Sequence, residues 1–151
     1  MRRLSGVLLA GAILLLPAFS QPAAAQEPQK LTFEGDTVVW MITVKPDKTA
    51  DFEAVIAALK DALNKSESPE AKRQAAGWKV VKGLKPQPDG SIIYMHIISP
   101  VVPGADYSLL QNIYPVVTDP AEQRALYDKY AGSFNSTLLQ VPFTTVVDMS
   151  K

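Results

Sequence analysis

The stretch TVVWMITVKPDKTADFEAVIAALK, residues 37–60, decides the fold that the sequence predicts. Its first part, 37–46, is rich in β-branched and aromatic residues and stops at Pro46, which is typical of a β-strand. An apolar stripe at helical spacing follows, made of Phe52, Val55, Ile56, Leu59 and Leu63. The segment therefore predicts a strand that leads through a short turn into an amphipathic helix over about 48–64.

The chain beyond this helix predicts the remaining elements. Ser68 before Pro69, with Gly77 beyond, indicates one or two helical turns. Two strands, at 78–86 and 91–99, then flank the turn segment PQPDG. A second helical region follows in two pieces, at 106–114 and 119–132, and the last strand is expected at 138–149. Pro142 has no N–H to donate, so we expect the last strand at a sheet edge or bulged there. The order is that of a ferredoxin-like βαββαβ fold: α+β, a four-stranded antiparallel sheet, and helices on one face.

The region before the first strand has the layout of a secretory signal peptide. A cationic start, an apolar stretch and three alanines form residues 1–25. The apolar stretch is about 10 residues, half of the roughly 20 that span a bilayer, so we expect no membrane span after cleavage. We therefore expect a periplasmic or secreted protein with a leader or linker at 26–36 and a single domain at 37–151.

Composition excludes several function classes. Without Arg2 and Arg3 the chain keeps 13 of its 15 basic residues against 15 acidic ones, and the basic residues are scattered. Nucleic-acid binding needs a concentrated basic patch, so no nucleic-acid partner is expected. The chain has no cysteine, which rules out disulfides, a lipid anchor and thiol chemistry. The motifs GxSxG, GxxxxGK[ST] and GxGxxG do not occur either.

Alternation along the strands sorts the side chains into two faces. One predicted set is aliphatic and methionine-rich, which suits packing under helices. The other is bulky and partly polar, and contains Trp40, Trp78, Tyr94, His96 and Phe143. We expect this aromatic set on the face that the helices leave uncovered. Because soluble monomers rarely expose a large apolar patch, a two-fold homodimer with the sheets face to face is expected to bury it.

The strand–turn–helix pattern of 37–60 and the element order to residue 149 resemble the dimeric α+β barrels of the antibiotic-biosynthesis-monooxygenase-like superfamily. The resemblance covers nearly the whole mature chain, but only as a pattern, and it transfers no catalytic residue. That superfamily includes cofactor-independent oxygenases, haem-degrading enzymes and isomerases. The stretches AAGWKVVKG (75–83) and GADYSLL (104–110) resemble a set of secreted bacterial proteins, and this resemblance implies no activity.

His96 is the chain's single histidine and the main candidate for chemistry. Its near-neutral intrinsic pKa suits a general acid or base, and a haem ligand or a cavity-lining group are further interpretations. The alternative is a neutral core histidine whose nitrogens are satisfied by Tyr94 or a backbone carbonyl. Trp40 and Trp78 either stack on a planar ligand or fill the dimer core. One histidine supplies too few ligands for a metal, so no metal site is expected.

Three hypotheses remain open at this point. The first is a homodimer whose aromatic-lined cavity binds a small hydrophobic or planar molecule; no cofactor is expected, with haem or flavin left open as ligands. The second is a cofactor-independent monooxygenase or isomerase with His96 as the acid/base. The third is a purely structural dimer without a ligand.

Overall fold

The sheet has four antiparallel strands. The structure, a computed structural model, describes residues 29–149. The strands are β1 (Thr37–Val44), β2 (Trp78–Lys82), β3 (Ile92–Ile98) and β4 (Phe134–Phe143). They lie in the order β2-β3-β1-β4, and each hydrogen-bonded neighbour is antiparallel. An α+β fold with an open antiparallel sheet is thus confirmed.

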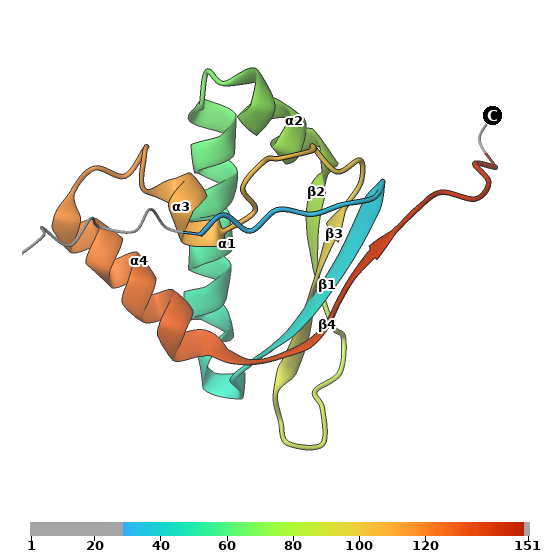
Figure 1. The fold of residues 1–151 in the computed structure, drawn as a ribbon. Helices are drawn as coiled ribbons and strands as arrows, with labels where there is room; N and C mark the ends of the chain where they lie inside the picture. Colours follow the sequence, from blue (N-terminus) through green and yellow to red (C-terminus); the bar gives the residue numbers. More distant parts are fainter. Residues whose placement is uncertain (1–28, 150–151) are drawn as a thin grey trace, which may run out of the picture.

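All helices of the described chain lie on one side of this sheet (Figure 1). They are α1 (Thr49–Lys65), α2 (Pro69–Gly77), α3 (Leu109–Ile113) and α4 (Pro120–Ser133), with a short 3₁₀ turn at Pro46–Lys48. The apolar stripe predicted at 48–64 is the buried side of α1, where Phe52 and Val55 are fully buried. α3 and α4 pack against α1. The molecule therefore has two layers, and the far side of the sheet carries no helix.

The aromatic side chains lie beneath the helices, so the predicted choice of uncovered face is wrong. The covered face is built by Val38, Trp40, Ile42, Val44, Tyr94, His96 and Ile98, all buried. The ring of Phe52 on α1 packs edge-on against Tyr94, with the ring centroids 4.7 Å apart. Aromatic rings bury more area than aliphatic side chains and contribute strongly to core packing, which suits them to the covered face. Because both faces are apolar, alternation alone did not distinguish them.

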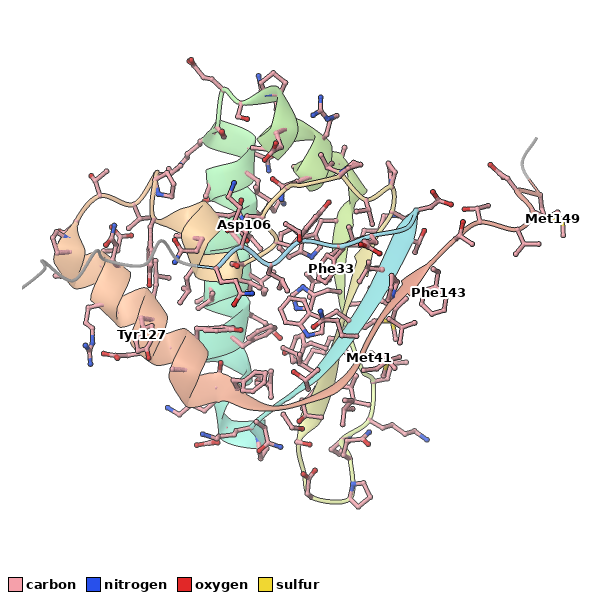
Figure 2. All side chains as sticks on the ribbon, viewed as in Figure 1. Phe33, Met41, Asp106, Tyr127, Phe143 and Met149 are labelled. Carbon is pink, nitrogen blue, oxygen red and sulfur yellow. The ribbon has the colours of Figure 1, made fainter. Side chains whose placement is uncertain are left out.

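The face that the helices leave bare is aliphatic and methionine-rich. We call it the open face, and its apolar members are Val39, Met41, Val81, Ile93, Met95, Ile97, Leu139, Val141 and Phe143. Met41 lies at its centre, paired with Met95 on one side and Leu139 on the other. Phe143, placed by the sequence with the other aromatic residues, lies on this face instead and is 47% exposed. Figure 2 shows its ring on the side of the sheet away from the helices.

The last strand differs most from its prediction. It begins at Phe134 and ends at Phe143, whereas the sequence predicted 138–149. The polar residues after Phe134 look like a loop, yet Ser136 hydrogen-bonds the Thr43 hydroxyl at 2.7 Å across the strands. β4 lies at the edge of the sheet, as expected from Pro142. The irregularities in its pairing with β1 lie away from Pro142, opposite Met41–Val44.

Beyond β4 the chain leaves the sheet because Asp36 holds the next residues. The Asp36 carboxylate accepts hydrogen bonds from the Thr145 N–H at 2.8 Å and the Thr144 hydroxyl at 3.1 Å. Val146 and Met149 are each 93% exposed in the segment that follows. The predicted strand residues after 143 therefore extend away from the sheet (Figure 1).

The leader before β1 packs on the domain. The Leu31 N–H donates to the Asp106 carboxylate at 3.0 Å, and the Leu31 carbonyl accepts from the Tyr107 N–H at 2.8 Å. Phe33 lies against the Tyr107 ring, with the centroids 5.2 Å apart. The signal peptide predicted at 1–25 lies outside the described residues. Within 29–149, no helix is long and apolar enough to cross a membrane.

Candidate functional site

Four of the five candidate site residues gather on the covered face. Trp40 and His96 are opposite each other on β1 and β3, and Trp78 begins β2 one strand farther out. Tyr94 is two residues before His96 on the same side of β3. Phe143 lies on the open face, separated from the other four by the sheet. The structure therefore brings Trp40, Trp78, Tyr94 and His96 together without Phe143.

His96 lies at the centre of a ring cluster. The Trp40 ring stacks on it with the centroids 4.6 Å apart and the planes 25° apart, and the Phe52 ring of α1 lies nearly perpendicular to it with the centroids 6.3 Å apart. The Trp78 indole N–H donates to His96 Nδ1 at 3.1 Å. Because Nδ1 accepts this bond, the neutral imidazole carries its proton on Nε2. Among the described residues, neither His96 Nε2 nor Trp40 Nε1 has a hydrogen-bond partner.

Burial keeps this imidazole neutral. Desolvation lowers the pKa of His96 to about 4, because the charged form loses its hydration in the core. The side chain is 0% exposed. His96 therefore acts on Trp78, whose indole it holds in place, and a substrate outside the core does not touch it.

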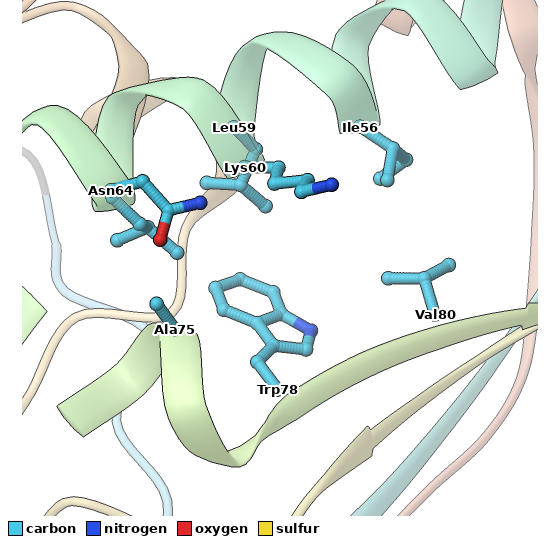
Figure 3. A pocket seen from close by; sticks show the side chains of 8 residues that line it. Ile56, Leu59, Lys60, Asn64, Ala75, Trp78 and Val80 are labelled. Atoms are coloured by element: carbon cyan, nitrogen blue, oxygen red, sulfur yellow. The ribbon is translucent and has the colours of Figure 1, made fainter. Parts of the chain in front are cut away.

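A groove runs between α1 and the edge strand β2, and Trp78 forms part of its floor. It consists of two adjoining hollows of about 420 Å³ and about 330 Å³, which share Ile56, Lys60 and Val80. Figure 3 shows the Trp78 indole and Val80 facing the α1 side chains across the first hollow. Pockets for small molecules have volumes of roughly 300–1,000 Å³ and mostly apolar walls with a few polar groups. The groove fits that description.

Local sequence explains both walls of the groove. On α1, Ile56, Lys60 and Asn64 recur at four-residue spacing, which places them in one row beside the buried stripe. On β2, Trp78 and Val80 alternate toward the helix side. α2 ends at Gly77 and β2 begins at the next residue, so no loop separates Trp78 from the end of the helix.

One end of the groove carries a paired set of charges. Glu53 Oε1 accepts a hydrogen bond from the Tyr94 hydroxyl at 2.6 Å and from Lys82 Nζ at 2.8 Å. The bond from Lys82 lowers the pKa of Glu53, and the same bond raises the pKa of Lys82. Desolvation, assisted by the bond to Glu53, raises the pKa of Tyr94 to about 12. This end is therefore neutralised within the protein.

Lys60, which borders both hollows, carries a charge that is not paired in this way. Within the described chain it makes no hydrogen bond and no ion pair. Asn64, one turn farther along α1, lines the first hollow (Figure 3). Within residues 29–149, no cluster of three or more His, Cys, Asp or Glu side chains could hold a metal ion. The groove thus offers apolar and aromatic walls with one unpaired cation.

Comparisons of the chain with protein-family models, curated proteins and solved structures found no match. The assignment of a function therefore depends on the geometry of this chain alone.

The sequence singled out two rings that border the groove and did not single out the residues of its helix wall. Trp78 and Tyr94 were expected to line a cavity, and both line the groove. Ile56 was assigned to the apolar stripe of the helix, and Lys60 was not among the candidate residues. The signal that marks them is the row at 56, 60 and 64, in which an apolar side chain, a cation and an amide share the border of the buried stripe.

Proposed function

We propose that the protein binds a small hydrophobic or planar molecule in the groove between α1 and β2, with the ligand lying on Trp78. The observation that carries this proposal is the half-buried Trp78 indole, which borders the larger hollow while its N–H is bonded to His96. An aromatic surface fixed in one orientation stacks on a flat ligand with little loss of side-chain entropy. Ile56 and Val80 supply the apolar contacts around it.

The ligand site replaces the cavity expected between two sheets. Trp40 and His96, which were to line that cavity, are buried in the core of the chain, while Trp78 borders the first hollow of the groove and Tyr94 the second. The burial of His96 gives the acid/base alternative no support, because a reacting group must come within hydrogen-bond reach of the base.

A fluorescence titration of two single-tryptophan variants tests the binding site. Trp40→Phe leaves Trp78 as the only indole of the mature chain, and Trp78→Phe leaves Trp40. We expect haem, flavin or a phenolic ligand to quench the first variant saturably and the second much less. Trp78→Leu should weaken the affinity about threefold to tenfold, as expected from aromatic contacts of ~0.5–1.5 kcal/mol. Absence of saturable quenching in the wild type with every one of these ligands would rule out the proposal.

We further propose that two copies associate through the open face and leave the Trp78 hollow of the groove free. The seven paired positions of β1 and β3 and the four strands give this face a flat projection on the order of 400 Å². Val81, Leu139 and Phe143 on it are between 39% and 47% exposed. Patches of that size on monomers are commonly functional. Because the helices occupy the opposite side of the sheet, such a dimer leaves the first hollow with Trp78 free. It meets the groove at Val81, which belongs to the open face and borders the second hollow.

The strand order β2-β3-β1-β4 and the single covered face support a ferredoxin-like arrangement. Together with the apolar open face, they support a dimeric α+β barrel of the monooxygenase-like superfamily as the proposed relationship. The layout of residues 1–25 supports export to the periplasm or beyond the cell.

A further inference from the structure

The charges along the groove are arranged unequally. At one end Glu53, Lys82 and Tyr94 bind one another, so the carboxylate and the ammonium there cancel. Lys60 lies between the two hollows and borders both. No acidic side chain lies three or four positions from it on α1, where an ion-pair partner would be reached. Its neighbours at those spacings are Ile56, Ala57, Leu63 and Asn64.

We propose that the ligand of this groove is an apolar anion: a flat or aliphatic hydrophobic body with one carboxylate or sulfonate-like acid group. The inference rests on the proposed binding function and specifies its ligand class. The body lies on Trp78 and Val80, and the acid group accepts hydrogen bonds from Lys60 Nζ, with the Asn64 amide as a second donor in the same hollow. Hydrogen bonds between an ammonium and an anion are shorter and stronger than neutral ones.

The position of Lys60 favours an anion over a cation or a neutral molecule. A cationic ligand would meet an unpaired ammonium, and the Glu53 carboxylate is already bound by two donors. A neutral ligand would use the apolar walls and leave the charge unused. The four-carbon stem of a lysine packs along apolar surface while its ammonium stays hydrated, so the same residue contacts both parts of an amphiphile.

Two fluorescent probes that differ by one acid group provide the test. 8-Anilinonaphthalene-1-sulfonate carries a sulfonate, and N-phenyl-1-naphthylamine has the same rings without it. We expect the wild-type protein to bind the sulfonate probe about threefold to tenfold more tightly than the neutral probe at low ionic strength. Added salt should reduce this ratio because it screens an exposed charge pair.

The variants separate the acid contact from the hydrophobic contact. Lys60→Gln should lower the affinity for the sulfonate probe to that for the neutral probe and leave the neutral probe unchanged. Lys65→Gln, on the same helix but outside both hollows, is the matched control and should change neither. Trp78→Leu should weaken both probes, because both place their rings on the indole.

Each contrary result overturns a defined part. Equal affinity of the two probes, both weakened by Trp78→Leu, would refute the anionic ligand and leave the binding site standing. If Trp78→Leu and Lys60→Gln leave the affinity for both probes unchanged while Met95→Glu abolishes the binding of both, the probes bind on the open face. That result would refute both proposals. A change of oligomeric state in Lys60→Gln, measured by light scattering, would make the groove a contact between copies and also refute the ligand.

Discussion

The surroundings of His96 determine both its tautomer and its protonation state. Its ring is enclosed by Trp40 on one side and by the Trp78 indole at Nδ1. Protonation of Nδ1 would replace an accepted hydrogen bond with two donors facing each other. The core therefore admits the neutral imidazole alone, which agrees with the pKa of about 4 that burial gives His96.

Acid should destabilise the protein through this residue. The unfolded chain takes up a proton near pH 6.5 and the folded protein near a pKa of about 4 for His96. Between these values the unfolded state binds more protons. The stabilisation is therefore complete above about pH 6.5 and is lost as the pH falls to about 4, by ~3 kcal/mol in total.

Urea unfolding between pH 7 and pH 4.5, compared with His96→Phe, measures this effect. The variant keeps an aromatic ring and removes the titrating group, so its curve should lack the part of the slope that His96 contributes. At pH 7 it should be less stable, because the Trp78 N–H loses its acceptor. Parallel curves for the two proteins, or an imidazole NMR titration of the folded wild type with a pKa near 6.5, would contradict the assignment.

The sequence placed Trp40, Trp78, Tyr94 and His96 together on one face of the sheet, as observed, but assigned that face to the wrong side. The chemistry of Trp40, Trp78, Tyr94 and His96 set them apart, and the period of two correctly predicted that they share a face. Their side of the sheet depends on which face α1 covers, and Val39, Met41 and Ile93 were equally apolar candidates for that contact. Lys60 was missed because the row at 56, 60 and 64 indicates a groove wall only once the opposite wall, formed by β2, is known.

Among the elements, α2 and β2 are joined in the tightest way. α2 ends at Gly77 and β2 begins at Trp78. The residues that follow β3 lie beside this junction, where the Ser99 N–H donates to the Gly77 carbonyl at 2.8 Å. A Cβ built on Gly77 would lie 2.7 Å from the Pro100 carbonyl oxygen and 3.2 Å from Ser99 backbone atoms. Backbone atoms cannot move aside as a flexible side chain can, so the glycine is required by close approach.

Gly77→Ala should therefore lower the free energy of unfolding by about 1–3 kcal/mol, the usual cost of overpacking. Gly132→Ala, in α4 with no atom within 4 Å of a new Cβ, is the matched control. It should be neutral or stabilise by up to about 1 kcal/mol, because alanine favours helix more than glycine does. Denaturant unfolding of both variants gives the comparison, and equal stabilities would refute the close-approach argument.

Element boundaries followed from the sequence where periodicity and punctuation agreed. The helix expected at 48–64 is α1, Thr49–Lys65, and the one expected at 119–132 is α4, Pro120–Ser133, whose start is capped by Asp119 accepting from the Ala121 N–H at 2.7 Å. β4 was misplaced because Asn135, Ser136 and Thr137 have weak strand propensity as a group. Their place in the sheet comes from pairing with β1, including the bond between the Ser136 and Thr43 hydroxyls, and pairing across 90 residues has no local signature.

For the whole molecule, the main consequence of the two-layer fold is the bare side of the sheet. The layers were predictable because the order of strands and helices restricts the architectures that bury every apolar stripe. The open face is apolar without being needed for the core, since the core lies wholly on the other side. An apolar face of this extent in a chain with no cysteine is consistent with stability shared between two copies.

The processed protein should be a dimer that separates when charge enters the open face. Met95 is opposite Met41 and Val81 in the middle of the sheet, so Met95→Glu places a carboxylate where a second copy would desolvate it. Leu84→Glu adds the same charge at a fully exposed leucine between β2 and β3 and serves as the control. Light scattering should report two subunits for the wild type and for Leu84→Glu, and one subunit for Met95→Glu with an unchanged circular-dichroism spectrum. A wild type that remains a single subunit at high micromolar concentration would refute the dimer. Because no open-face residue lines the first hollow, which holds Trp78 and Lys60, ligand binding there should persist in the monomeric variant.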